Sequence, residues 1–137
     1  MRAPLVLALL FPLLLAGCGG SSPATGISGT VSLDPQLTDQ VSGEDTVFLF
    51  ARRTAGPPIP LAIQRLQVSD LPFRFQLDDS HAMTDMVLSS VDEVIVVVRV
   101  SRSGQAMPQA GDLEGQSGPV ATAGTTDLEI VIDRVRP

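Results

Sequence analysis

The sequence predicts an all-β fold, an immunoglobulin-like antiparallel β-sandwich of about seven strands, preceded by a lipoprotein signal peptide. Short apolar stretches recur with the two-residue alternation that is typical of half-buried strands. Turn-forming residues separate these stretches at short intervals, and no stretch has the length and period of a long helix. One run, Val94–Arg102, is almost entirely β-branched, so both of its faces must be covered. This pattern indicates two sheets packed face to face.

The first half of the domain contains four expected strands. Ile27–Leu33 alternates apolar and polar side chains, and Thr46–Arg52 is apolar on both faces, which places it inside a sheet. The segment Arg53–Pro60 contains three closely spaced prolines, so we expect an extended connection there. Leu61–Val68 and Phe73–Leu77 follow as strands, and the second of them has the clearest alternation.

The second half is organised around Val94–Arg102, the expected central strand. Ser90 and Glu93 have the spacing of a capping box, which predicts a single helical turn before this strand. His81–Leu88 is the least patterned segment and is compatible with a short edge strand. The loop Ser103–Gly115 should project from one end of the sandwich, because it is too long for a minimal hairpin. The remaining elements are a return arm at Asp112–Ser117, a loop at Pro119–Thr126 and a last strand at Leu128–Val135.

The first residues have the composition of an export signal. Residues 1–17 carry the positive Arg2 and an apolar stretch, and they end in Leu-Ala-Gly before Cys18, which matches a bacterial lipobox. We therefore expect a signal peptide over 1–17, a lipid on Cys18, a flexible tether over 18–26 and the folded domain over 27–137. The expected location is the periplasmic face of a bacterial membrane, and Gly19 after the cysteine favours the outer membrane.

Composition argues against several classes of function. The formal net charge is −6 and there is no Trp or Tyr, so nucleic-acid binding is not expected. A single cysteine permits no disulfide within the chain. Catalysis is not expected either, because His81 is the only histidine and there is no Gly-x-Ser-x-Gly motif. No cofactor is predicted.

One constellation suggests a metal as an alternative. His81, Met83 and Met86 place an imidazole and two thioethers within six residues, and Met107 lies in the long loop. Thioether and imidazole ligands favour Cu(I). A periplasmic Cu(I)-binding lipoprotein is therefore an alternative, beside the simpler interpretation that the methionines fill the core. A structural envelope module is a third alternative.

Two stretches resemble a known family. The first lies between residues 57 and 80, with Pro-Pro-Ile-Pro-Leu-Ala and Val-Ser-Asp-Leu-Pro as its motifs. The second lies between residues 88 and 115 and ends in Ala-Met-Pro-Gln-Ala-Gly-Asp-Leu-Glu-Gly. Both are similar to the C-terminal periplasmic domain of the cytochrome c-type biogenesis protein CycH, also called CcmI. The resemblance extends over nearly the whole domain, from about Ile27 to Val135.

The resemblance implies an immunoglobulin-like domain and a non-enzymatic role in the maturation of c-type cytochromes. Family members hold apocytochrome c and present it to the haem-ligation machinery. Apocytochrome c or a component of the ligation complex is therefore the implied partner. The membrane spans and helical repeats of the full family protein have no match here, and the expected lipid anchor stands in their place.

The long loop carries the most family-specific residues, so we expect a protein-binding surface there. Its apolar side chains would make the contacts, and its acidic side chains would form a polar rim. The candidate binding residues are Met107, Pro108, Gln109, Asp112 and Glu114, with the first two as contacts and the last two as the rim.

Overall fold

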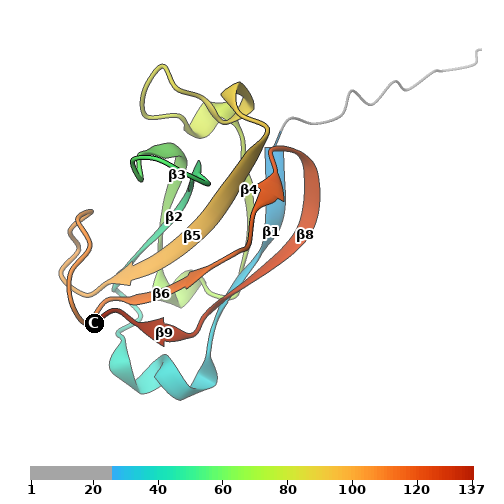
Figure 1. The fold of residues 1–137 in the computed structure, drawn as a ribbon. Coiled ribbons are helices and arrows are strands. Elements are labelled where there is room, and N and C mark those ends of the chain that lie inside the picture. The colour runs from blue at the N-terminus through green and yellow to red at the C-terminus, as the bar shows by residue number, and fades with distance from the viewer. Residues whose placement is uncertain (1–25) are drawn as a thin grey trace, which may run out of the picture.

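The computed structural model describes residues 26–137 and shows a two-sheet all-β domain (Figure 1). This confirms the predicted all-β sandwich class. The expected signal peptide, Cys18 and Gly19 lie outside the described residues. Within residues 26–137, none of the helices is long and apolar enough to span a membrane.

The smaller sheet has three strands in the order β4-β1-β8. They are β4 (Phe73–Leu77), β1 (Gly26–Leu33) and β8 (Ala123–Ile132). β1 pairs antiparallel with β4 but parallel with β8. The prediction of a wholly antiparallel sandwich is therefore wrong at this pair, because the first and last long strands run side by side in the same direction.

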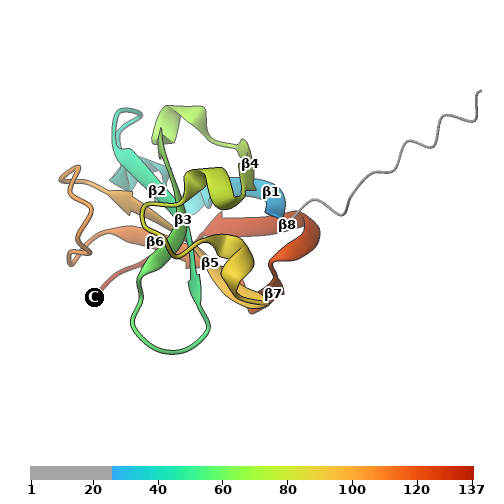
Figure 2. The ribbon, with the colours of Figure 1, turned by 90° about the horizontal axis from the view of Figure 1, so that it is seen from above.

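The larger sheet has six strands, with β3, β2, β5, β6 and β9 in order and β7 paired to the start of β5. All of its pairs are antiparallel. The bounds are β2 (Thr46–Arg53), β3 (Pro60–Gln67), β5 (Glu93–Ser101), β6 (Leu113–Gln116), β7 (Val120–Ala121) and β9 (Arg134–Val135). Viewed from above, the two sheets lie face to face, and the proline-containing β2–β3 connection extends away from them (Figure 2). β3 is an edge strand, which agrees with the proline at its start.

β5 is the central strand, as its composition predicts. On its inner face Val94, Val96, Val98 and Val100 are fully buried. The outer face is also covered, and Arg99 is buried there. Burial of a valine side chain stabilises a fold by about 1.5–3 kcal/mol, so this strand contributes strongly to the core. The rest of the core comes from both sheets and from Leu88 of the short helix at 88–90: Ile27, Val31, Val47, Leu49, Ala51, Leu61, Ala62, Leu66, Phe75, Leu77, Leu88, Leu113, Ile130 and Ile132.

The C-terminal part differs from its prediction. The expected loop at Pro119–Thr126 contains β7 and the first part of β8. The expected strand Leu128–Val135 is divided, because the chain leaves the smaller sheet after Ile132 and joins the larger one as β9. The sequence does not predict the start of β8, because its side chains are mostly exposed and show no apolar alternation. Its position in the sheet depends on backbone pairing with β1.

The short helices are all of the 3₁₀ type: η1 (Pro35–Gln40), η2 (Val68–Asp70), η3 (Asp79–His81) and η4 (Leu88–Ser90). The capping box predicted at Ser90 and Glu93 is wrong. Ser90 is the last residue of η4, and its hydroxyl donates to the carbonyl of Val87, which precedes that helix. Glu93 is the first residue of β5 and does not belong to a helical turn. The suggested edge strand at 81–88 is also wrong, since bends and irregular backbone connect the end of η3 to the start of η4 there.

Strand β6 of the larger sheet lies close to β8 of the smaller sheet at Gly115. A Cβ atom on Gly115 would lie 2.0 Å from the Val131 carbonyl oxygen on β8. No real side chain tolerates that separation, so the position requires glycine for contact and not for backbone conformation.

We predict that Gly115→Ala lowers the free energy of unfolding by at least about 1–3 kcal/mol, the usual range for overpacking. Urea denaturation measures this change. Gly118→Ala is the matched control, because a Cβ atom there meets nothing within 4 Å. Equal effects of the two substitutions would contradict the close approach of β6 and β8.

Candidate functional site

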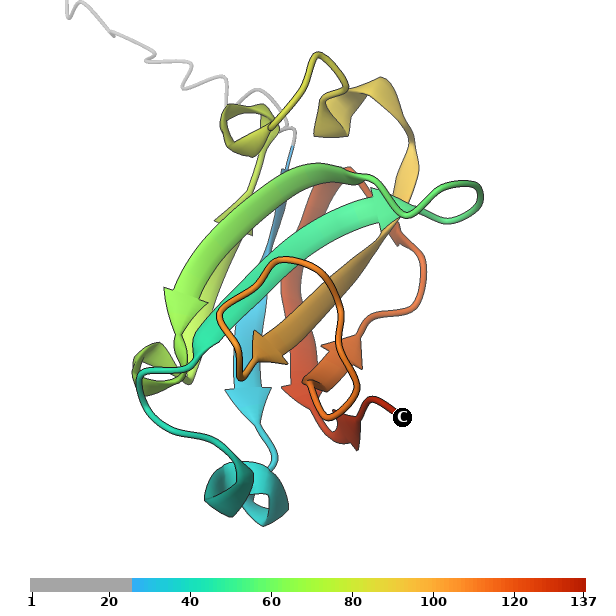
Figure 3. The same ribbon diagram turned by 90° about the vertical axis from the view of Figure 1, so that its left-hand side faces the viewer.

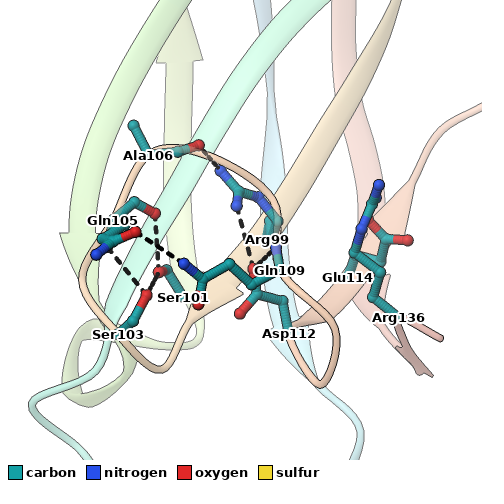
Figure 4. Close-up of polar contacts among 9 residues, drawn as sticks. All are labelled: Arg99, Ser101, Ser103, Gln105, Ala106, Gln109, Asp112, Glu114 and Arg136. Atoms are coloured by element: carbon teal, nitrogen blue, oxygen red, sulfur yellow. Dashed lines mark hydrogen bonds and ion pairs between the residues drawn. The ribbon is translucent and has the colours of Figure 1, made fainter.

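The long loop after β5 does not project from the end of the sandwich as predicted. It folds back over the outer face of the larger sheet, in front of β2 and β5 (Figure 3). Arg99 on β5 holds it there. Its Nη1 lies 3.1 Å from Asp112 Oδ2, and its Nη2 donates to the Ala106 carbonyl (Figure 4). The side chains of Arg99 and Asp112 are only 5% and 3% exposed, so this is a buried ion pair.

Further hydrogen bonds fix both ends of the loop. The Ser101 hydroxyl donates to the Gln105 carbonyl at 2.9 Å. At the other end, the Gln109 backbone N–H donates to Asp112 Oδ2 at 2.9 Å. The Arg136 backbone N–H donates to the Asp112 carbonyl at 2.7 Å, which ties the C-terminal segment to the loop. The loop is therefore anchored at its base and at Ala106.

Phe48 lies under the loop between two arginines. The strand register aligns Arg65, Phe48 and Arg99 across β3, β2 and β5. The guanidinium carbons of Arg65 and Arg99 lie 5.6 and 5.4 Å from the Phe48 ring centre. Such cation–π contacts contribute about 0.5–2 kcal/mol each. Phe48 is 5% exposed, so the ring forms a buried floor.

An apolar hollow of about 300 Å³ opens beside this floor. Phe50 and Ile63 extend the floor, since they are neighbours across β2 and β3. Met83 and Met107 stand at the rim and are 66% and 75% exposed. The hollow is lined by Phe48, Phe50, Pro58, Pro60, Ile63, Met83, Arg99, Ala106, Met107 and Pro108.

A second hollow of about 510 Å³ continues across the sheet and carries positive charge. It shares Phe50, Pro58, Arg99 and Pro108 with the apolar one. Its other lining residues are Arg52, Gly56, Val97, Glu114, Gln116 and Arg136. We call the two hollows together the cross-sheet groove. Its walls are the β2–β3 connection and the loop after β5, and it has an apolar end and an arginine end.

The structure places the predicted binding residues in different surroundings. Met107 and Pro108 line the groove, and Glu114 lies at its arginine end. Gln109 is exposed and bonded within the loop. Asp112 is 2% exposed, so the expectation that it forms a rim is wrong; its carboxylate is occupied by Arg99. A binding role for the other four residues stays a prediction.

The floor of the groove was not predicted. Phe48, Phe50 and Ile63 come from strands that are distant in sequence from the loop. Phe48 and Phe50 share the outer face of β2, and that spacing was the available signal. A β2 strand apolar on both faces implies that something covers the outer face, but the sequence alone does not say what.

The residues of the Cu(I) alternative have separate surroundings. Met86 packs against the core, whereas Met83 lines the groove. His81 Nδ1 lies 3.3 Å from the Asp78 backbone nitrogen and 3.2 Å from Asp78 Oδ1, so it takes part in a local turn. Bonds from the Ser80 hydroxyl and backbone N–H lower the pKa of Asp78. Cu(I) binding stays a prediction without a structural observation in its favour, and no cluster of three or more His, Cys, Asp or Glu able to hold a metal occurs within residues 26–137.

We predict that Arg99→Met lowers the free energy of unfolding by about 3–5 kcal/mol, because it leaves the Asp112 carboxylate buried without its partner. Urea denaturation measures the change. Amide hydrogen exchange should also accelerate in the loop around Ala106.

Two variants control this experiment. Arg74→Met changes an exposed arginine on the smaller sheet and should have little effect. The double variant Arg99→Met/Asp112→Leu should recover much of the stability, since two apolar side chains replace the pair, yet its loop should still exchange fast. A loop that stays protected in the double variant would show that Arg99 does not hold it.

Comparison with known proteins places this chain in a family. Residues 27–133 match the family model described as the cytochrome c-type biogenesis protein H Ig-like domain. The cytochrome c-type biogenesis protein CycH of Pseudomonas aeruginosa is 41% identical over 113 residues. That match covers 80% of this chain and 27% of CycH, so the chain spans about a quarter of that relative's length. An uncharacterized protein of Aquifex aeolicus is 27% identical over 111 residues, covering 80% of this chain and 71% of that protein.

A solved structure, an alternative pilotin from the type II secretion system of Vibrio cholerae, is 11% identical with a TM-score of 0.46. The aligned region covers 80% of this chain and 96% of the pilotin chain. The family match, by contrast, includes both loops that wall the groove and confirms the resemblance noted in the sequence. The chain therefore belongs to the family of CycH immunoglobulin-like domains.

Proposed function

We propose that this protein is a non-enzymatic accessory factor in cytochrome c maturation. It binds another protein, either apocytochrome c or a component of the haem-ligation complex. The observation that carries this proposal is the family match over residues 27–133. The name of the Pseudomonas aeruginosa relative, a cytochrome c-type biogenesis protein, supports the same process.

The groove supports a binding role. Exposed thioethers and a floor of aromatic and branched side chains are suited to apolar contact with a protein. The loop that forms one wall contains the Ala-Met-Pro-Gln run on which the family resemblance depends. A surface that combines family-specific residues with concave apolar shape is a suitable place for a partner to dock.

The proposal includes a lipid anchor on Cys18 at the periplasmic face of a bacterial membrane. The lipobox and the short apolar segment before it support this location, and Gly19 favours the outer membrane. Several acyl chains would hold the protein stably at the membrane, where a single chain binds only reversibly.

We predict that Cys18→Ser releases the protein from the membrane fraction and abolishes labelling by radioactive palmitate. Fractionation followed by immunoblotting measures the first effect, and autoradiography measures the second. Retention in the membrane fraction with unchanged labelling would contradict the anchor.

We predict that deletion of the gene lowers the content of c-type cytochromes, measured by haem-stained gels of membrane and periplasmic fractions. Expression of the wild-type chain should restore them. A b-type cytochrome serves as the control for haem supply, because its haem is not covalently attached. Unchanged c-type cytochromes in the deletion strain, together with no co-purified maturation factor, would overturn the proposed function.

A further inference from the structure

We infer that the cross-sheet groove binds a short extended peptide segment with two apolar side chains at one end and a carboxylate at the other. The inference rests on the proposed protein-binding function and deepens it, because it assigns the chemistry of the segment that is recognised. Its basis is the size of the apolar end, the charge of the arginine end and the concave shape between them.

The apolar end has room for two side chains. A cavity of about 150 Å³ accommodates one benzene-sized group, so a hollow of about 300 Å³ accommodates roughly two. Phe50 and Ile63 offer an apolar floor that is only partly buried. The flexible side chains of Met83 and Met107 at the rim can adjust to groups of different shape.

The length of the groove favours a short segment. Its floor crosses β3, β2, β5 and β6, which are three strand spacings, or about 14 Å. An extended chain advances about 3.3 Å per residue, so roughly four or five residues span the floor. Alternate side chains of such a segment point the same way and can enter the apolar end together.

The charge of the other end favours a carboxylate. The protein carries a net charge of −6, yet Arg52 and Arg136 both line this hollow. Arg136 Nη1 lies 3.5 Å from Glu114 Oε2, and both side chains are partly exposed. Arg52 takes part in none of the ion pairs within residues 26–137. A carboxylate on the partner can accept hydrogen bonds from a guanidinium group of this lining. Arg99 does not recognise the partner, because Asp112 and Ala106 occupy it.

A peptide suits this surface better than a membrane does. Phe48 and Phe50 lie on the floor between two loops, at 5% exposure for Phe48. The flat surface of a bilayer contacts protruding side chains and does not reach a recessed floor. A peptide chain can enter between the walls at Pro58 and Pro108 and contact the floor directly.

Selection from a random library of peptides of roughly seven residues, displayed on phage, tests the inference with the full chain purified in mild detergent. The expected consensus has two apolar residues separated by one position, followed by Asp or Glu. Fluorescence polarisation then measures the affinity of a selected peptide. Met107→Ser should weaken binding about tenfold, as expected for an apolar contact at a binding hot spot.

Arg52→Gln should also weaken binding about tenfold, and the remaining affinity should depend less on salt. Matched controls lie on the smaller sheet. Val131→Ser removes a side chain that is 44% exposed, and Arg74→Gln removes an exposed arginine. Both control variants should bind the peptide as the wild-type chain does.

Three results would overturn the inference: no enriched peptide, a consensus without an acidic residue, or equal losses in the groove variants and the controls. Sedimentation of the Cys18→Ser chain with phosphatidylglycerol vesicles tests the membrane instead. Vesicle binding that Met107→Ser abolishes, in the absence of a peptide consensus, would assign the groove to a lipid surface.

Complementation separates this inference from the proposed function. If Met107→Ser and Arg52→Gln restore c-type cytochromes in the deletion strain as the wild-type chain does, the groove assignment fails and the maturation role stands. If the peptide results are as expected but the deletion strain has normal c-type cytochromes, the peptide site stands and the maturation role fails.

Discussion

The buried ion pair between Arg99 and Asp112 is the constraint on which the outer face of the larger sheet depends. On β5 the arginine Arg99 lies between two valines, and its side chain is almost fully buried. An unpaired charge in such a place costs several kcal/mol, so the chain must supply a counter-charge and hydrogen-bond acceptors. Asp112 and the Ala106 carbonyl supply them, and both belong to the loop that follows. The loop therefore folds back over the outer face of the sheet instead of extending past the end of the sandwich.

With the loop folded over it, the larger sheet has two different faces. The inner face packs apolar side chains against the smaller sheet and stabilises the fold. The outer face would be an exposed aromatic patch around Phe48 without the loop, and with it becomes a groove that has a floor and two walls. Arg99 contributes twice, because its guanidinium also lies against the Phe48 ring at 5.4 Å. The core and the proposed binding surface therefore share β5 but use opposite sides of it.

The sequence was sufficient to predict the central strand and most of the other strands, because β-branched runs and alternation report burial directly. It failed where long-range pairing overrides local pattern: the start of β8 is polar and exposed, yet its backbone pairs with β1. It also failed at Asp112, which has the composition of a loop residue facing solvent. A signal was present, since a single arginine within the valine run of β5 requires a buried partner. The sequence does not state which of 15 acidic residues is that partner, and only the fold identifies Asp112.

The distribution of arginine extends this argument from one residue to the whole sheet. Of the eight arginines in residues 26–137, seven lie in strands of the larger sheet or within two residues of them, and only Arg74 belongs to the smaller sheet. The guanidinium groups of Arg99 and Arg65 contact the Phe48 ring, whereas Arg52 and Arg136 line the arginine end of the groove. Because the ion pair and Ala106 fix the loop, the side chains between these anchors can change without loosening the fold. The specificity of the proposed peptide site can thus vary around Met107 and Pro108, while Arg99 on β5 sets the position of the loop.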